Sequence, residues 1–547
     1  MEGRVDVPIE TERPWQAGLC QFFTREKVAE LCLRQVGFPK NLLYLKLLEP
    51  AAGQGAFFLP LLPRLVRSCR RQNKSFEVLR PLIRAYEIDG GLAATLRLQI
   101  QARLEVLGVE PPRARSIARG WVRNEDFLEA CPRMRFTHIV GNPPYIRWDA
   151  IPGSLRESYK VRFASFKQRA DLYVVFIEHA LSLLEEQGQL AFLCPGTWTR
   201  NVYGSAVRDA FTSLGQLKTI IDFSDADSFE TAADAYPHFF VFQKGRSGPT
   251  RICSMAGVDK IAPSGKSVVR TFLPSTSPLL LTRDSAATKT VNAARQRFPK
   301  IEDAGCTIRV GSATGCNDIF LGSRRELAIE RGRLLPFVNA HSIQKSKVRW
   351  TGTYIVNVFD ANGKVVTLSR FPRMAAYLRR HKKKLQARAK ASKSKIWWRS
   401  IDSLHPAWHA ARKLLVVDVS TSPVIGLDHV GYCAGSGVYQ IKSGDWPLTD
   451  LLFFLSAGVL GLFVAALSAG AANGYHRFQK NQIAAVHLPR WDELDARWKK
   501  KFKAARSGKN GDAILKLVAE QYACKASLLA NYVARDWQHF CSKPSAR

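Results

Sequence analysis

Short apolar runs recur along the first 245 residues and alternate with stretches of helical spacing. Each run has the length of a buried strand, and Asp171 opens a helix that continues to Leu184. The strand candidates are residues 42–48, 81–86, 136–140, 189–194, 217–223 and 237–244. Strands that alternate with helices in this way predict an α/β fold with a doubly wound, Rossmann-like sheet.

Two features at the N-terminal end refine this pattern. Thr24 is placed to cap a helix that extends to Leu33, with Glu26 in its first turn. Pro60 and Pro63 fall where the helix after the first strand should run. We therefore expect that helix to begin later or to be kinked.

The alternation is lost from about residue 246. We place a first domain at residues 1–245, a second, mixed α+β domain at 246–491, and a basic helical tail at 492–547, hinged near residues 507–511. Residues 451–472 are uncharged and long enough to span a bilayer. Their Gly, Ser and Ala content and the basic sequence on both sides favour one or two buried helices, so we expect no membrane partner.

The balance of charge implies a polyanionic partner. The 547 residues carry 81 Lys and Arg against 46 Asp and Glu, a formal net charge of +35. Nucleic acid is the leading candidate, and an anionic membrane surface is the alternative. The 11 cysteines include no Cys-x-x-Cys pair, so neither a metal site nor a disulfide framework is indicated. The first 13 residues lack the apolar core of a signal peptide, and we expect a cytoplasmic protein.

Asn142, Pro143, Pro144 and Tyr145 directly follow a strand candidate and its glycine, and they carry the strongest sign of chemistry. Ligands bind at the carboxyl ends of strands in open α/β sheets, and the two prolines stiffen the turn. Asn142 offers a side-chain carbonyl, Pro143 a backbone carbonyl, and Tyr145 a flat ring. Two acceptors beside a stacking platform suit the exocyclic amino group of a planar base, whose lone pair is freed for attack when both hydrogens are accepted. The alternative is a proline-stiffened loop without chemistry.

A glycine-containing turn follows the first strand candidate. Glu49 ends that strand, and Gly53 and Gly55 allow backbone N–H groups to approach a ligand closely. A single Gly-x-Gly is a weak signal without its context.

Acidic residues also follow the next two strands. Glu87 stands where an acid accepts hydrogen bonds from both hydroxyls of a ribose. Asp126 is placed to accept from an adenine amino group, with Phe127 packed on the ring. Taken singly, Glu87 is better explained as a solvated loop carboxylate. The alternative for Asp126 and Phe127 is an ordinary acidic turn whose phenylalanine belongs to the core.

The order of these motifs resembles the γ-class N6-adenine DNA methyltransferases of restriction–modification systems, the TaqI-like group. In that family the cofactor motifs come first, the catalytic tetrad next and a target-recognition domain last. The resemblance covers residues 18–244 motif by motif and continues more loosely to about residue 491. It implies that S-adenosyl-L-methionine is the cofactor and that its methyl group is transferred to N6 of an adenine flipped out of duplex DNA.

The resemblance also assigns roles to individual residues. The cofactor-binding residues that it implies are Phe23, Thr24, Glu49, Ala51, Gly53, Gly55, Glu87, Ile88, Asp126 and Phe127. The catalytic residues that it implies are Asn142, Pro143, Pro144 and Tyr145, with Phe229 as a second aromatic against the target base. The sequence departs from the family pattern at Glu49, where some members carry Asp, and at Ala52 and Gln54, where Cys and Ser are common.

Residues 379–399 form the most basic stretch of the second half. Cations beside stackable aromatic rings suit contact with a DNA backbone, and the alternative is a solvated helix face. We assign DNA contact to Lys382, Lys383, Lys384, Arg388, Lys390, Lys393, Lys395 and Trp397. Residues 311–320 resemble the start of the family's recognition domain, and they lack the ending of a phosphate loop.

These observations predict a monomeric, site-specific adenine DNA methyltransferase of a restriction–modification or phage-defence system. A separate restriction nuclease or defence-system subunits are candidate partners. Two alternatives stay open: a methyltransferase of RNA or protein glutamine, and a catalytically silent DNA-binding subunit. The charge of +35 favours DNA, and intact Glu87, Asn142 and Tyr145 argue against a silent subunit.

Overall fold

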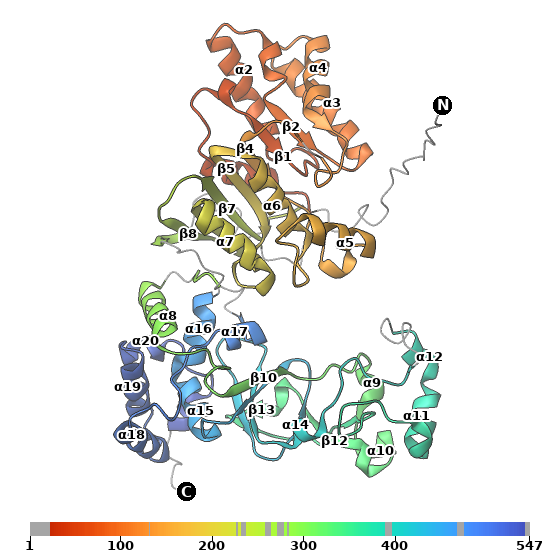
Figure 1. Cartoon of the computed structure of the whole chain (residues 1–547), viewed down its shortest axis with the longest axis vertical. Helices are drawn as coiled ribbons and strands as arrows, with labels where there is room; N and C mark the ends of the chain where they lie inside the picture. Colours follow the sequence, from red (N-terminus) through yellow and green to blue (C-terminus); the bar gives the residue numbers. More distant parts are fainter. Residues whose placement is uncertain are drawn as a thin grey trace. The chain divides into compact units, whose positions relative to one another are not determined.

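The computed structural model describes residues 22–130, 132–225, 228–230, 237–256, 264–270, 278–281, 284–388, 396–467 and 475–541. The chain divides into two compact units, Met1–Arg283 and Asp284–Arg547 (Figure 1). Each unit has its own sheets and its own core.

The described strands of the first unit form one nine-stranded sheet of order β3-β2-β1-β4-β5-β7-β6-β8-β9. Pairing is parallel from β3 to β5, and β7 runs antiparallel to both β5 and β6. The strands are β1 (Leu47–Glu49), β2 (Ile83–Tyr86), β3 (Val122–Arg123), β4 (Phe136–Gly141), β5 (Leu184–Pro195), β6 (Gly215–Asp225), β7 (Pro237–Lys244), β8 (Thr250–Ala256) and β9 (Ser264–Arg270). The chain starts at β1, winds outward to β3 and crosses back to β4, which confirms the predicted doubly wound fold.

Helices connect these strands, and α6 packs against β5 while α7 packs against β6. The helices are α1 (Glu26–Gln35), α2 (Leu62–Arg71), α3 (Gly90–Val106), α4 (Pro111–Trp121), α5 (Gly153–Arg162), α6 (Leu172–Leu183) and α7 (Ser205–Leu214). The central strands are apolar where both of their faces are covered, as in residues 190–194 of β5. Ile139 of β4, for example, pairs with Leu48 and Leu190, and all three side chains are fully buried.

Two sequence expectations need correction in this unit. Thr24 does not cap α1, which begins at Glu26 after Arg25; instead Thr24 forms an antiparallel bridge with Phe229. Residues 42–44 form a 3₁₀ turn capped by Asn41, so the first strand starts only at Leu47. The start of α2 at Leu62 agrees with a delayed helix, because Pro63 lies in its first turn, where a missing N–H costs little.

The first unit also extends past residue 245. Strand β8 pairs in parallel with β6, and β9 pairs with β8. Both strands cover what would otherwise be an open sheet edge. The compact unit therefore ends at Arg283, beyond the boundary that we expected.

The second unit is mixed α+β, as predicted. Its described strands form sheets of order β10-β20-β16-β18-β14-β13, β11-β15-β12-β19 and β17-β21. They are β10 (Cys306–Val310), β11 (Leu321–Gly322), β12 (Leu334–Val338), β13 (Ile343–Gln344), β14 (Lys347–Val348), β15 (Tyr354–Val356), β16 (Lys413–Val417), β17 (Val419–Ser420), β18 (Ile425–Asp428), β19 (Cys433–Ala434), β20 (Val438–Ser443) and β21 (His476–Arg477). The helices are α8 (Ser285–Arg297), α9 (Asn317–Phe320), α10 (Arg324–Leu327), α11 (Pro372–Arg380), α12 (Lys382–Gln386), α14 (Pro406–Ala410), α15 (Leu448–Phe454), α16 (Leu460–Leu467), α17 (Lys480–Ala484), α18 (Ala496–Ser507), α19 (Gly511–Gln521), α20 (Ala526–Ala530) and α21 (Trp537–Cys541).

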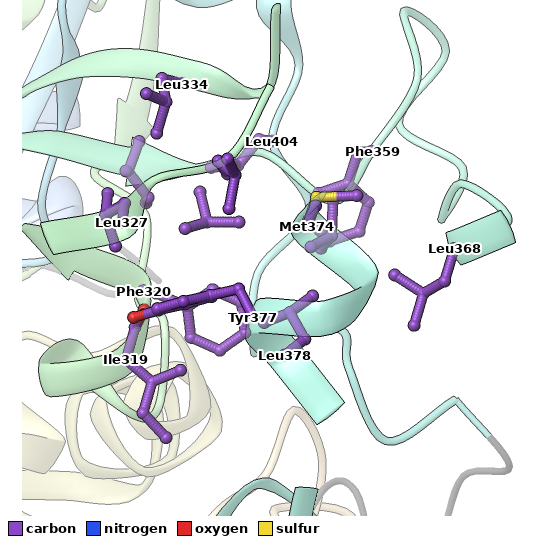
Figure 2. Packing of buried hydrophobic residues seen from close by; sticks show 14 of the residues in the cluster. Ile319, Phe320, Leu327, Leu334, Phe359, Leu368, Met374, Tyr377, Leu378 and Leu404 are labelled. Atoms are coloured by element: carbon purple, nitrogen blue, oxygen red, sulfur yellow. The ribbon is translucent and has the colours of Figure 1, made fainter. Parts of the chain in front are cut away.

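A separate apolar cluster supports α11 and the basic sequence after it. Figure 2 shows Met374, Tyr377 and Leu378 of α11 together with Phe320 and Leu404 in this cluster. The Tyr377 hydroxyl donates a hydrogen bond to the Ile319 carbonyl at 2.8 Å. Leu385, which lies within the basic stretch, is buried in the same cluster, so one face of that stretch is anchored in a core.

The long apolar stretch lies inside the second unit. Within the described residues, Leu448–Leu467 is the stretch that is long and apolar enough to cross a membrane, and 89% of its most apolar window is buried. The backbone leaves the helical region at Ala457 and Gly458, which divides the stretch into α15 and α16. A Cβ on Gly458 would lie 2.3 Å from the Leu529 carbonyl oxygen, so glycine permits the close approach of α20. This agrees with two buried helices.

The C-terminal helices complete the same core instead of forming a separate tail. Trp498 and Phe502 of α18 are buried, and the ring centroid of each lies 6.3 Å from that of Phe454 on α15. Tyr522, after α19, lies 6.0 Å from Phe454 by the same measure. The expected boundary at residue 492 does not separate two bodies, because the amphipathic tail covers the apolar helices.

A buried ion pair joins β16 to β18. Lys413 Nζ lies 2.8 Å from Asp428 Oδ2, both side chains are 0% exposed, and the ammonium also donates to the carbonyls of His409 and Ala411. Asp428 accepts three backbone N–H bonds from the turn that follows it. The network satisfies both charges within the sheet.

Lys413→Ala leaves the Asp428 carboxylate buried without its cation. We expect a loss of about 3–5 kcal/mol in the free energy of unfolding, the usual cost of breaking such a pair from one side. Urea unfolding of the full chain, followed by tryptophan fluorescence, measures it. Lys384→Ala is the control, because its ion pair with Asp318 is 62% and 58% exposed and should not matter measurably. Equal midpoints for the two variants would contradict the assigned role.

Candidate active site

One pocket at the carboxyl ends of β1, β2 and β4 gathers nearly all the residues predicted for catalysis and cofactor binding. It encloses about 1030 Å³, including solvent at its mouth. The predicted residues in its wall are Phe23, Thr24, Glu49, Ala51, Gly53, Glu87, Ile88, Asp126, Phe127, Asn142, Pro143, Pro144 and Tyr145. Gly55 and Phe229 lie outside this lining. Its walls are mostly apolar and carry a few convergent polar groups, as is usual for a site that binds a small molecule.

The glycine turn is fastened to the end of β2. Gly53 and Gly55 have φ of +49° and +77°, and a Cβ on Gly55 would lie 2.7 Å from Leu96 Cδ1. The Gly53 N–H donates to Glu87 Oε2 at 2.8 Å, and the Asp89 N–H donates to Glu87 Oε1 at 2.9 Å. Gly55 therefore allows the turn to pack closely against Leu96. Both oxygens of Glu87 accept backbone hydrogen bonds, and each keeps a further lone pair that could accept from a ribose hydroxyl.

Glu49 is buried in the same pocket and has an unsatisfied oxygen. Its side chain is 1% exposed, and Oε2 has no hydrogen-bond partner. Burial, and next the neighbouring Glu87 carboxylate, raise the pKa of Glu49 well above its usual value. Two buried carboxyl groups of this kind suit a ligand that carries positive charge and hydroxyl donors, which is the donor set of S-adenosylmethionine.

The part of the pocket around Phe127 and Ile88 is apolar. Phe127 is buried, with ring centroids of Tyr86 and Phe176 at 5.7 Å and 5.4 Å from its own. Ile88 is 36% exposed in the pocket wall, which leaves it available to a planar ring. The residues present therefore fit both ends of the cofactor.

The orientation of the Asn142 side chain is fixed by its partners. Its Nδ2 donates to the Phe22 carbonyl at 2.8 Å and to Thr24 Oγ1 at 3.1 Å. A backbone carbonyl only accepts hydrogen bonds, so the amide nitrogen must face Phe22. The Asn142 Oδ1 is left buried and without a partner. This free acceptor is the group that the sequence argument requires.

Phe229 and Tyr145 come together although 84 residues separate them in the sequence. Their ring centroids are 5.8 Å apart and nearly perpendicular. Arg25 Nε donates to the Phe229 carbonyl at 2.8 Å, and Thr24 pairs with Phe229. Burial raises the pKa of Tyr145 well above its usual value, so its hydroxyl stays protonated.

Phe22 lies at the site but was not among the residues predicted from the sequence. Its ring centroid lies 5.5 Å from that of Tyr145 and 5.4 Å from that of Phe229, so the three rings form a triangle. The signal available was the Phe22–Phe23 doublet, of which we used only the second member. Leu172 and Phe176 of α6 also line the pocket, and their helical spacing gave no sign of it.

The basic stretch of the second unit separates into exposed and engaged side chains. Lys382, Lys383 and Lys384 are exposed, and Lys384 pairs with Asp318. Lys382 Nζ lies 5.8 Å from the centroid of the half-buried Trp397 ring. Lys390, Lys393 and Lys395 lie outside the described residues.

Arg388 is turned into the second unit. Its guanidinium donates to the carbonyls of Leu385, Thr314, Trp397 and Arg399 at 2.8–3.1 Å. Burial lowers its pKa. Arg388 therefore fastens the segment around Trp397 to the unit, and the DNA contact expected from its charge stays a prediction.

No set of three His, Cys, Asp or Glu side chains within the described residues is placed to hold a metal ion. The site geometry therefore rests on carboxylates, amides and aromatic rings.

Comparison with known proteins defines the class. A family model described as Eco57I restriction-modification methylase matches residues 112–229. The chain is 32% identical over 503 residues to the Type II methyltransferase M.XhoI of Xanthomonas vasicola, covering 86% of this chain and 91% of that protein. It is 31% identical over 494 residues to M.PaeR7I of Pseudomonas aeruginosa, covering 86% of each. In fold it is similar to the Type IIL restriction-modification enzyme MmeI, solved in complex with DNA, with a TM-score of 0.59 at 15% identity over 95% of this chain and 76% of that one.

The relatives identify a methyltransferase of the restriction–modification class, and the doubly wound, Rossmann-like sheet agrees with it. Within that class, the chain belongs to the Type II methyltransferase family.

Glu49→Gln tests the buried carboxyl group. A raised folded-state pKa means that Glu49 favours folding below the usual carboxyl pKa and that this contribution is lost as pH rises through the raised value. The variant should therefore melt at a higher temperature at neutral pH, with a flatter dependence on pH. Its affinity for S-adenosylmethionine should fall by about 10- to 100-fold, the worth of one charged hydrogen bond. Thermal melting and calorimetric titration measure both, with the exposed Glu77→Gln as control; unchanged cofactor affinity would refute the role.

Proposed function

We propose that this protein is a site-specific DNA methyltransferase that uses S-adenosylmethionine to methylate N6 of adenine in duplex DNA. The observation that carries the proposal is the free, buried Oδ1 of Asn142, which adjoins Pro143 and the Tyr145 ring in a pocket with a ribose-binding acid at its other end. We further propose that it acts as a cytoplasmic monomer in a restriction–modification or phage-defence system, beside a separate nuclease or defence subunits.

Binding of the target base follows from the aromatic rings. The adenine leaves the duplex and stacks on Tyr145, with Phe229 close to the edge of that ring. Phe22 packs against both rings, so its side chain must turn aside as the base enters. Aromatic stacking offsets part of the cost of unpairing the base.

Asn142 and Pro143 prepare the nucleophile. The Asn142 Oδ1 and the Pro143 carbonyl accept the two N6 hydrogens, which favours a tetrahedral nitrogen and frees its lone pair. When bound, S-adenosylmethionine supplies a methyl group on a positively charged sulfur. The nitrogen would take up that methyl group with its freed lone pair while the sulfur kept the electrons of its former bond, and the nitrogen would then lose one proton to water.

No strong base is needed in this scheme. The Tyr145 hydroxyl is held protonated by burial, and both Glu87 oxygens are engaged by backbone N–H groups. Two hydrogen bonds hold the Asn142 side chain before the adenine enters. No free energy is therefore spent on orienting it during the reaction.

DNA is favoured over the other substrates. A charge of +35 has no use in a protein glutamine methyltransferase, and the named relatives are Type II methyltransferases. A silent subunit has no need of an unsatisfied acceptor buried beside a cofactor-sized pocket.

Asn142→Ala should leave DNA binding largely intact and lower methyl transfer by about two to three orders of magnitude, because it removes a preorganised contact to the transition state. Transfer of a labelled methyl group from S-adenosylmethionine to plasmid DNA, followed by analysis for N6-methyladenine, measures the loss. Asn41→Ala is the matched control, since Asn41 also makes side-chain hydrogen bonds but caps a distant turn. Unchanged turnover in the Asn142 variant would eliminate the mechanism.

Reversing the charges of Lys382, Lys383 and Lys384 should weaken binding to all DNA sequences alike, because exposed lysines contact phosphates. Arg388→Ala should instead lower the melting temperature, because its guanidinium bonds only to carbonyls of its own unit among the described residues. Binding to duplexes of several sequences and thermal melting separate the two effects. A loss confined to one sequence would mean that the lysines read bases.

A further inference from the structure

The chain between the catalytic tetrad and α6, residues 146–171, forms a closed loop that carries α5 (Figure 1). Two hydrogen bonds join the two ends of this loop. They run from the Leu172 N–H to the Ile146 carbonyl at 2.9 Å and from the Trp148 N–H to Asp171 Oδ1 at 3.3 Å. Tyr159, Phe163 and Phe166 fill its interior and are 0–6% exposed. This post-tetrad loop is therefore a folded element with a defined surface.

Two arginines of the post-tetrad loop stack on one tryptophan. The guanidinium carbons of Arg156 and Arg169 lie 4.1 Å and 5.0 Å from the centroid of the Trp148 ring. Cation–π contact is strongest with tryptophan, and it fixes the plane of each guanidinium while leaving the N–H groups free to bond. Within the described part of the chain, neither side chain has a carboxylate or hydrogen-bond partner. Two like charges held at one ring in this way suit an anion with several acceptor oxygens.

The backbone supports the same conclusion. Gln168 and Arg169 are consecutive non-glycine residues in the left-handed region, with φ of +54° and +63°. This conformation is costly for such residues and persists only where the surrounding structure imposes it, which is typical of functional sites. Here it places Arg169 against Trp148.

The position of Trp148 identifies the anion. Trp148 follows Tyr145 by three residues, so the two Cα atoms are at most about 11 Å apart along an extended chain. A base that stacks on Tyr145 remains tied to its own sugar and phosphates, which must lie near the mouth of the pocket. Exposed Arg147 and Lys167 add to the positive charge of the post-tetrad loop.

We propose that Trp148, Arg156 and Arg169 form a clamp that binds the DNA backbone phosphates flanking the flipped adenine. The Arg156 and Arg169 guanidiniums donate to the phosphate oxygens, and Trp148 is a positioning residue that holds them in place. The location beside a flipped adenine rests on the proposed function, whereas phosphate binding by the two arginines does not.

The first test measures binding of the full chain to a short duplex of arbitrary sequence by fluorescence anisotropy over a range of salt concentrations. At about 0.1 M salt, Arg156→Ala and Arg169→Ala should each weaken binding roughly tenfold, and each should reduce the slope of log affinity against log salt by about 0.9, the value for one phosphate contact. Arg64→Ala is the matched control, because Arg64 is also exposed and stacked, on Phe38 of the same unit, but lies on α2. Melting temperatures identify any variant that is misfolded.

Several results are distinguishable in this test. Wild-type affinity and salt slope in the double variant would overturn the clamp, even if methyl transfer fell. Clamp-dependent binding by a wild-type chain that methylates no DNA would uphold phosphate binding and refute the proposed function. Arg156→Lys and Arg169→Lys keep the charge without the planar fork, so they should restore the salt slope but only part of the affinity.

The second test locates the bound phosphates. Once the methylated adenine has been mapped by modified-base sequencing, an uncharged methylphosphonate is placed at each phosphate that flanks it. The substitution should weaken binding by the wild-type chain and have little further effect on the double arginine variant, since both changes remove the same contact. Losses that simply multiply would show that the arginines bind other phosphates and would overturn the assigned position.

Discussion

The active site depends on a short antiparallel contact between two segments that lie about 200 residues apart, residues 22–25 and 228–230. Backbone hydrogen bonds join Arg25 to Ser228 and Glu230 to Phe23, and Arg25 adds a side-chain bond to the Phe229 carbonyl. This contact places Phe229 beside Tyr145 and presents the Phe22 carbonyl to Asn142. One pairing therefore sets both the position of the aromatic rings and the direction of the Asn142 amide. Without it, the tetrad would remain a stiff turn whose asparagine is free to rotate.

The buried carboxyl groups of the pocket lower the stability of the folded protein. Glu49 and Glu87 are buried near each other, and burial raises the pKa of both. Backbone N–H groups stabilise Glu87, whereas one oxygen of Glu49 has no partner. Such an arrangement becomes favourable once a cation is bound, so in the function that we propose the carboxyl groups that weaken the folded state would also give affinity for a positively charged cofactor.

The sequence predicted most where the pattern is local or repeated. Strand β7 has the predicted limits of Pro237–Lys244 because it is apolar on both faces, and the tetrad lies at a strand end because β4 is apolar up to its glycine. Prediction from the sequence failed where the bonding partner of a side chain is set by the tertiary fold. Thr24 has the side chain of a typical helix cap, but its backbone pairs with Phe229. Arg388 has the charge of a typical surface residue, but its guanidinium donates to four carbonyls. A residue type defines what a side chain is able to bond to, and only the fold defines which partner is within reach.

The carboxyl groups of the pocket have opposite effects on a cationic cofactor and on the phosphates of DNA. A pocket lined by Glu49, Glu87 and Asp126 attracts a cationic cofactor, but the same carboxyl groups repel the phosphates of any DNA brought to the pocket mouth. Raised pKa values at Glu49 and Glu87 weaken that repulsion only in part, because a bound cation draws the carboxyl groups back to their ionised forms. Positive charge close to the mouth is needed to offset the rest, and it must not enter the pocket, where it would repel the cofactor. In the clamp that we propose, arginines stacked on a ring that does not line the pocket would meet both conditions, since the stacking fixes their position outside it.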